Sequence, residues 1–244
     1  MRALSKTLLY ISLFTFSMTQ AKAIEKITSA DGQRFNAIVT GPESSDMGII
    51  IVHDWFGITK FTKESASRLA EQGARVIAVD LYKGESAKDH DNAKRLQQSL
   101  TQAYAQKGIA AAIKTLTTKK RRIAIIGYSA GGKFALRAST ENPDTINATA
   151  LIYGGGYETP SNELLANASP LLSIYGSNDK WAHESFTKLN QQLQSVDKSA
   201  EVYIYPNVDH AFAQKLFNGG KNYDVAATEA MHKVLDNFLS RHLQ

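Results

Sequence analysis

Apolar runs of strand length alternate along this chain with segments of helical periodicity. The runs are rich in β-branched residues and span 48–52, 76–79, 123–126, 148–153, 171–175 and 202–205. Such unbroken runs are typical of strands covered on both faces. Helices are expected over 63–72, 88–116 with a break at Gly108, 133–139, 183–196 and 224–242. This alternation predicts an α/β fold in one compact domain, with a mostly parallel, twisted sheet and helices on both faces.

Two shorter segments precede the first long run. Residues 24–29 and 34–39 have strand-like composition, and the turn signal Asp31-Gly32 lies between them. Together they predict a β-hairpin. No repeat and no linker-like stretch interrupts the chain, so residues 24–244 are expected to form the domain.

The N-terminal segment has the three parts of a secretory signal. Arg2 and Lys6 give a positive start, residues 7–18 are apolar, and the sequence of residues 21–23 is Ala-Lys-Ala, a small-x-small cleavage site. The apolar stretch is shorter than the ~20 residues of a membrane-spanning helix. We expect residues 1–23 to be a cleavable signal peptide and the protein to be exported, periplasmic or secreted, with no stable membrane insertion afterwards. An uncleaved membrane anchor is the alternative.

Composition narrows the chemistry. The 244 residues include no cysteine, which excludes thiolate nucleophiles, zinc-thiolate sites and lipidated cysteine. Removing the leader, which has three basic and no acidic residues, lowers the formal net charge from +5 to +2. The basic run 119–122 precedes an apolar strand and contains no aromatic residue, so nucleic acid is not an expected partner.

A tight turn between a strand and a helix carries the main candidate. Gly127-x-Ser129-x-Gly131 follows the run 123–126 and matches a nucleophile elbow, in which flanking glycines let strand and helix approach closely. The same residues satisfy most of a phosphate-binding loop, G-x-x-x-x-G-K-[ST], but Phe134 occupies the hydroxyl position. The elbow is therefore the preferred interpretation.

A serine nucleophile needs a histidine base and an acid that orients it. His210 lies just after the last predicted strand, and Asp179 follows the strand before it, which gives the order Ser129, Asp179, His210 expected on this fold. Asp209 is poorly aimed because it directly precedes the histidine, and Asp80 precedes the serine. Taken alone, Asp179 is equally the N-cap of the next helix.

The remaining site residues are expected around this triad. The oxyanion hole would use the backbone N–H groups of Ala130 and of Trp55, in the loop after the first long strand. Trp55 and Phe56 could wall the pocket or belong to the core, and Tyr128, beside the nucleophile, is a further candidate for substrate contact. Asp89-His90-Asp91 resembles a metal cluster, but acids in the first turn of a helix are usually placed for the helix dipole. No metal is expected.

Four segments in order resemble the dienelactone hydrolase family of α/β-hydrolases. They are His53-Asp-Trp-Phe-Gly57, Val79-Asp-Leu-Tyr82, Gly127-Tyr-Ser-Ala-Gly-Gly132 and Asp209-His-Ala-Phe212. The resemblance covers nearly all of the chain after the leader. It implies an α/β-hydrolase fold, a triad of Ser129, Asp179 and His210, and hydrolysis of small esters or lactones without a cofactor.

Three features depart from that family. Its nucleophile is commonly cysteine and here is Ser129, and the acid that faces the resting thiol is commonly glutamate and here is Asp54. The arginines that hold the substrate carboxylate have no counterpart, although Lys83 and Lys215 lie beside the corresponding positions in the sequence. We include Asp54, Lys83 and Lys215 among the candidate substrate-binding residues.

The sequence thus predicts an exported serine hydrolase that cleaves small carboxylic esters or lactones through an acyl-enzyme. A peptidase or acyltransferase of the same fold is one alternative, and a pseudo-enzyme that only binds a ligand is another. The sequence makes no prediction of oligomeric state or of the individual ester.

Overall fold

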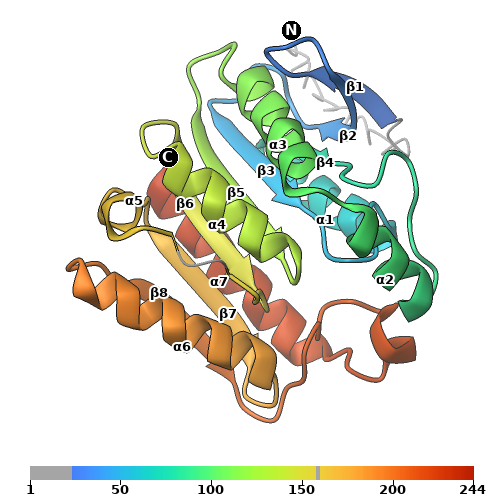
Figure 1. The fold of residues 1–244 in the computed structure, drawn as a ribbon, viewed down its shortest axis with the longest axis vertical. Coiled ribbons are helices and arrows are strands. Elements are labelled where there is room, and N and C mark those ends of the chain that lie inside the picture. The colour runs from blue at the N-terminus through green and yellow to red at the C-terminus, as the bar shows by residue number, and fades with distance from the viewer. Residues whose placement is uncertain (1–23, 158–159) are drawn as a thin grey trace, which may run out of the picture.

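The computed structural model describes residues 24–157 and 160–244, built around one eight-stranded sheet (Figure 1). The strands are β1 (Ile24–Thr28), β2 (Arg34–Thr40), β3 (Met47–Val52), β4 (Arg75–Val79), β5 (Arg122–Tyr128), β6 (Ile146–Ile152), β7 (Leu171–Gly176) and β8 (Ala200–Tyr205). Their order is β1-β2-β4-β3-β5-β6-β7-β8. The pairs β1–β2 and β2–β4 are antiparallel, and the other five are parallel. The predicted mostly parallel α/β fold is confirmed. The predicted signal peptide, residues 1–23, lies outside the described residues.

Helices cover both faces of the sheet. α3 (Gln102–Leu116), α4 (Gly131–Glu141) and α6 (Lys180–Ser195) lie on the face toward the viewer in Figure 1, and α1 (Lys60–Glu71) and α7 (Val225–Leu243) lie behind. The sides taken by α1, α3, α4 and α6 follow from right-handed crossovers, because the chain moves along the sheet in one direction from β3 to β4 and in the opposite direction from β4 to β8. α7 follows the last strand and covers the same face as α1. α2 (His90–Ser99), α5 (Asn162–Ala166) and the 3-10 turn η1 (Phe217–Gly220) lie outside these layers.

The core lies between the central strands and the two helical layers. β3 to β7 are buried almost throughout, as their apolar runs predict. β8 differs, because it is the edge strand of the sheet and Val202, Tyr203 and Ile204 remain exposed. The expectation that this strand is covered on both faces is wrong. An apolar run alone does not distinguish a central strand from an edge strand.

The predicted helix over 88–116 is two helices, and the predicted break at Gly108 is wrong. α2 ends at Ser99, and its C-cap Leu100 has an extended backbone. α3 starts at Gln102, after the N-cap Thr101, whose side chain accepts from the Tyr104 N–H. Gly108 lies inside α3, where a Cβ would come within 3.1 Å of Phe35. The absence of a side chain at Gly108 allows α3 to pack closely on the sheet. The short helix α5 was not expected from periodicity.

Candidate active site

The candidate site lies at the carboxyl ends of the parallel strands, where α/β sheets bind ligands. Ser129 comes directly after β5 with a backbone φ of +48°, a left-handed conformation that is strained for a residue with a side chain. Its N–H donates to the Ile152 carbonyl at 3.0 Å, and its carbonyl accepts from the Gly132 N–H at 2.9 Å. These two bonds hold the turn, and the side chain remains 6% exposed.

The glycines on either side of this turn are required by close contacts. A Cβ at Gly131 would lie 2.4 Å from the His53 carbonyl oxygen and 2.5 Å from that of Val52. A Cβ at Gly127 would lie 2.6 Å from the Gly132 Cα. Strand, turn and helix therefore meet at distances that only glycine permits, as the elbow interpretation requires.

Ser129, His210 and Asp179 form a continuous chain of hydrogen bonds. The Ser129 Oγ lies 2.9 Å from the His210 Nε2, and the His210 Nδ1 lies 2.6 Å from the Asp179 Oδ2. The other Asp179 oxygen, Oδ1, accepts from the Ala182 N–H at 3.0 Å and caps α6. Asp179 therefore both contacts His210 and caps α6, the two roles that the sequence allows for it.

The loop that carries His210 is fixed from two sides. The Asn222 side-chain amide donates to the His210 carbonyl at 2.8 Å, and Ala211 adopts a positive φ of +57°. On the strand side, a Cβ at Gly176 would lie 2.1 Å from the Val208 carbonyl oxygen, so the loop passes directly over the end of β7. Asn222 has no motif around it and was not expected from the sequence.

The two expected oxyanion donors lie in the turns that flank the nucleophile. Ala130 is the N-cap of α4 with helical backbone angles, and Trp55 lies in the turn after β3. Neither backbone N–H group has an acceptor among the described residues. Both are therefore free to donate to a substrate oxygen.

Asp54 lies under the site and is fully enclosed. Its Oδ1 accepts from the Phe56 N–H and its Oδ2 from the Gln214 side-chain amide, both at 2.8 Å. The Gln214 Oε1 accepts in turn from the Leu216 N–H at 3.1 Å. Burial raises the pKa of the Asp54 carboxyl above its ordinary value, because desolvation outweighs these hydrogen bonds. The Gln214 side chain therefore links the Asp54 carboxyl to the backbone of the loop that follows His210.

His53 connects the ends of two strands. Its Nε2 accepts from the Leu81 N–H at 3.2 Å, so the proton is on Nδ1, which donates to the Asp54 carbonyl at 2.5 Å. Burial lowers the pKa of this imidazole. The neutral ring satisfies both backbone groups, which gives His53 a structural position rather than one in the triad.

Four expected substrate contacts occupy other surroundings. Phe56 and Tyr128 are almost fully buried, with Phe56 packed on Trp55 and Tyr128 packed on Phe61. The ammonium groups of the two lysines lie over tyrosine rings, Lys83 over Tyr104 at 4.9 Å and Lys215 over Tyr223 at 4.7 Å. Among the described residues, no hydrogen bond or ring contact joins these four side chains to Ser129, Asp179 or His210.

Aromatic rings from three separate segments of the chain, the end of β6, the start of α6 and η1, surround His210. Tyr153, Trp181 and Phe217 each meet its ring edge-on, with centroids at 5.6, 5.3 and 5.2 Å. Phe217 also contacts His90 at 5.2 Å, and His90 contacts Trp55 at the same distance. Of these rings only Trp55 was expected to line the site, because the segments that carry the others show no motif for it.

Asp89 and His90 have structural partners of their own. Asp89 is the N-cap of α2 and accepts from the Asn92 N–H at 2.8 Å, while the His90 ring packs on Trp55. Among the described residues, no group of three or more His, Cys, Asp or Glu side chains is placed to hold a metal ion. Within the same residues, none of the helices has the length and apolar character needed to cross a membrane.

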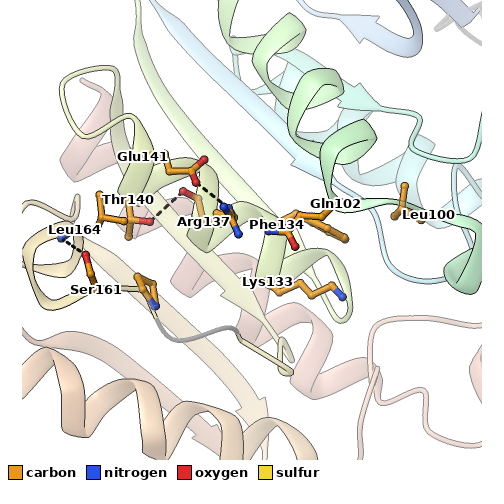
Figure 2. Close-up of a pocket in the computed structure, with 10 residues that line it drawn as sticks. Leu100, Gln102, Lys133, Phe134, Arg137, Thr140, Glu141, Ser161 and Leu164 are labelled. Atoms are coloured by element: carbon orange, nitrogen blue, oxygen red, sulfur yellow. Dashed lines mark hydrogen bonds and ion pairs between the residues drawn. The ribbon is translucent and has the colours of Figure 1, made fainter.

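A separate surface cavity of about 430 Å³ lies on the outer side of α4. Figure 2 shows Arg137 beside Glu141 in this cavity, with Phe134 and Lys133 on the same helix. The Lys133 ammonium lies over the Phe134 ring at 4.9 Å. No triad residue lines this cavity.

The sheet order, the serine turn and the position of the site define an α/β-hydrolase. The model of the dienelactone hydrolase family matches residues 35–243. The chain therefore belongs to the dienelactone hydrolase family, a family of hydrolases, as the four sequence segments indicate.

Relatives extend the likeness over most of the chain. The carboxymethylenebutenolidase of Rhodococcus opacus is 27% identical over 214 residues, covering 82% of this chain and 84% of that protein. Carboxymethylenebutenolidase 1 of Cupriavidus pinatubonensis is 24% identical, covering 83% and 90%. A dienelactone hydrolase-like promiscuous phosphotriesterase from metagenomic libraries has the same fold, with a TM-score of 0.78 at 20% identity, covering 92% of this chain and 100% of that one.

Proposed function

We propose that this protein hydrolyses small carboxylic esters or lactones through an acyl-enzyme formed on Ser129. The observation that carries the proposal is the hydrogen-bond chain from the Ser129 Oγ through His210 to the Asp179 Oδ2. Curated relatives named carboxymethylenebutenolidase support the reaction class. The proposed steps use protein groups, substrate and water alone.

In the first half of the reaction, His210 Nε2 takes the Ser129 proton as the Oγ attacks the ester carbonyl. Asp179 keeps the imidazole in the tautomer that exposes Nε2 and stabilises the imidazolium that forms. The N–H groups of Ala130 and Trp55 receive the negative charge on the carbonyl oxygen, each contributing roughly 3 to 4 kcal/mol. His210 then protonates the departing alkoxide, which leaves as the alcohol.

In the second half, a water molecule enters where the alcohol has left. His210 Nε2 removes its proton, the hydroxide attacks the acyl carbon, and the Ser129 Oγ leaves and regains the proton. Asp54 touches neither Ser129 nor His210 by a hydrogen bond, and its bonds to Phe56 and Gln214 give it a positioning role beneath the Trp55 turn.

The experiment that tests this function is turnover of a short-chain chromogenic ester by wild type and Ser129→Ala. The variant is expected to lose at least a thousandfold in kcat while keeping its circular dichroism spectrum. Ser99→Ala is the matched control, since its hydroxyl donates only to the Leu96 carbonyl in α2. Full activity in Ser129→Ala would contradict the proposed nucleophile.

Export is the second part of the proposal and rests on the leader sequence. We expect processing after Ala23, so that the mature chain begins at Ile24. N-terminal sequencing of the protein from fractionated producing cells tests this, with Ala23→Phe as a variant expected to block cleavage. A full-length protein found only in the cytosolic fraction would contradict export.

A further inference from the structure

An aromatic wall lines one side of the candidate site. We use this name for Trp55, His90, Trp181 and Phe217, whose rings come from the turn after β3, the first residue of α2, the start of α6 and the start of η1. Trp181 is 43% exposed, and Trp55 and Phe217 are half-buried. These rings therefore offer apolar surface to a ligand, whereas Tyr153, on another side of His210, is fully buried.

The wall stands where the alcohol part of an ester must lie. In the proposed mechanism His210 Nε2 delivers the proton to the departing oxygen, so the alcohol group lies against the histidine. Trp181 and Phe217 are the partly exposed rings in direct contact with that imidazole, at 5.3 and 5.2 Å. The alcohol substituent therefore meets ring edges and faces.

The rings are held in place by contacts that do not involve a ligand. Phe217 begins a turn in which Asn218 and Gly219 have φ of +50° and +63°. The Asn218 N–H donates to His90 Nε2 at 3.4 Å, and its side chain donates to Asn222, which also holds the His210 carbonyl. The turn is thus connected to both the wall and the histidine loop.

Trp181 is fixed in a similar way from the other side. A Cβ at Gly155 would lie 2.7 Å from the indole ring, so the loop after β6 passes directly over it. The Gly156 N–H donates to the Ser185 hydroxyl at 2.9 Å, one turn further along α6. A fixed wall loses little entropy when a ligand binds.

Charge at the wall does not favour an acidic substituent. The ammonium groups of the two lysines that the sequence offers for a carboxylate lie over the rings of Tyr104 and Tyr223, neither of which belongs to the wall. His90 uses Nε2 to accept from the Asn218 N–H, and the Trp55 indole N–H is buried without a partner among the described residues. An uncharged ring is the group that this surface accommodates best, because aromatic pairs gain from edge-to-face contact beyond the area they bury.

We propose that the preferred substrates are uncharged esters whose alcohol part carries an aromatic ring, and that Phe217 and Trp181 determine this preference. The inference rests on the proposed function, since it assigns the alcohol side from the role of His210. It makes Phe217 a specificity-determining residue of the same site.

The test compares benzyl acetate, cyclohexylmethyl acetate, ethyl acetate and 4-carboxybenzyl acetate, which share one acyl group and have alcohols of similar leaving ability. Wild type is expected to show a kcat/KM for benzyl acetate at least tenfold above ethyl acetate, and about threefold above cyclohexylmethyl acetate. The carboxylate is expected to lower kcat/KM about tenfold. Equal or faster turnover of the carboxylate ester would overturn the proposal.

Variants of the wall locate the preference. Phe217→Ala is expected to raise KM for benzyl acetate about tenfold and to lower kcat/KM for benzyl acetate about tenfold more than kcat/KM for ethyl acetate. Phe217→Tyr keeps the ring and is expected to keep the preference. Leu216→Ala, the neighbouring exposed position, is the control and should match wild type.

The outcomes separate the two proposals. Ester turnover that depends on Ser129 but shows no benzyl preference, or a loss in Phe217→Ala that is equal for benzyl and ethyl acetate, overturns the aromatic inference alone. Absence of both ester turnover and labelling of Ser129 by a fluorophosphonate overturns the proposed function and this inference with it.

Discussion

Asp179 contacts His210 with one carboxylate oxygen and caps α6 with the other. The Oδ2 to Nδ1 distance is 2.6 Å, and the Oδ1 accepts from Ala182 at 3.0 Å. The helix cap fixes the side chain from its own main chain, so the oxygen that faces the histidine is already oriented before substrate binds.

This double role predicts different effects for two substitutions of Asp179. Asp179→Asn keeps a good cap but presents an amide to His210, so kcat should fall about a thousandfold or more while the free energy of unfolding changes little. Asp179→Ala should lose activity and about 1 kcal/mol of stability as well. Urea unfolding and ester kinetics on both variants check this. Equal stability of the two variants would contradict the capping role.

The backbone of Ser129 gives a second prediction. At a φ of +48° a residue with a Cβ is strained, whereas glycine adopts this conformation readily. Ser129→Gly and Ser129→Ala should both be inactive, but the glycine variant should be more stable by about 1 kcal/mol. Thermal or urea unfolding measures the difference. An alanine variant as stable as the glycine variant would show that the turn carries no strain.

Gly131 should be far less tolerant of a methyl group than an exposed glycine. In Gly131→Ala the new Cβ meets the carbonyl oxygens of Val52 and His53, and we expect a loss of about 3 kcal/mol or more together with most activity. Gly32→Ala is the control, since its φ is +85° and nothing lies within 4 Å of its Cβ. That variant should lose only about 1 kcal/mol. Similar losses in both would contradict the close contact at Gly131.

His53 predicts a pH effect on stability. Burial lowers the pKa of its imidazole, so below about pH 6.5, the ordinary value for histidine, the unfolded chain binds a proton that the folded protein does not. Stability that His53 contributes is therefore present above that pH and is lost as the pH falls. In His53→Gln the free energy of unfolding should decrease less steeply as the pH falls, with a slope smaller by up to about 1.4 kcal/mol per pH unit.

The measurement is urea unfolding of wild type and His53→Gln at several pH values between 5 and 7.5. His183→Gln, which removes an exposed imidazole from α6, is the matched control and should follow wild type. A variant slope identical to that of wild type would contradict a neutral, buried His53.

Much of the fold follows from local pattern, and the exceptions have physical causes. The apolar runs predict β3 to β7, because burial on both faces demands continuous hydrophobicity. They also place β8, although that edge strand is exposed, and strand-like composition around a turn signal predicts the hairpin of β1 and β2. The break predicted at Gly108 is wrong because this glycine allows close packing of α3 against Phe35. That contact lies between residues far apart in the sequence, so the local pattern does not reveal it. The helix is interrupted instead at Leu100 and Thr101, the C-cap of α2 and the N-cap of α3.

Some residues of the candidate site could also be predicted from the sequence, and others could not. Ser129, Asp179 and His210 could be predicted because each follows a separate strand and the strand ends meet at one edge of the sheet. The positions of His90, Trp181 and Phe217 could not be predicted, because they depend on how α2, α6 and η1 pack over that edge. Lys83 and Lys215 lie beside the expected positions in sequence, but their ammonium groups lie over Tyr104 and Tyr223.

The most direct test of the central claim is mass spectrometry after reaction with a fluorophosphonate. Wild type is expected to be phosphonylated on Ser129 alone, Ser129→Ala to be unlabelled and His210→Ala to be nearly unlabelled, because the hydroxyl needs its base. Labelling of wild type at another residue, or undiminished labelling of His210→Ala, would contradict an active site built on Ser129 and His210.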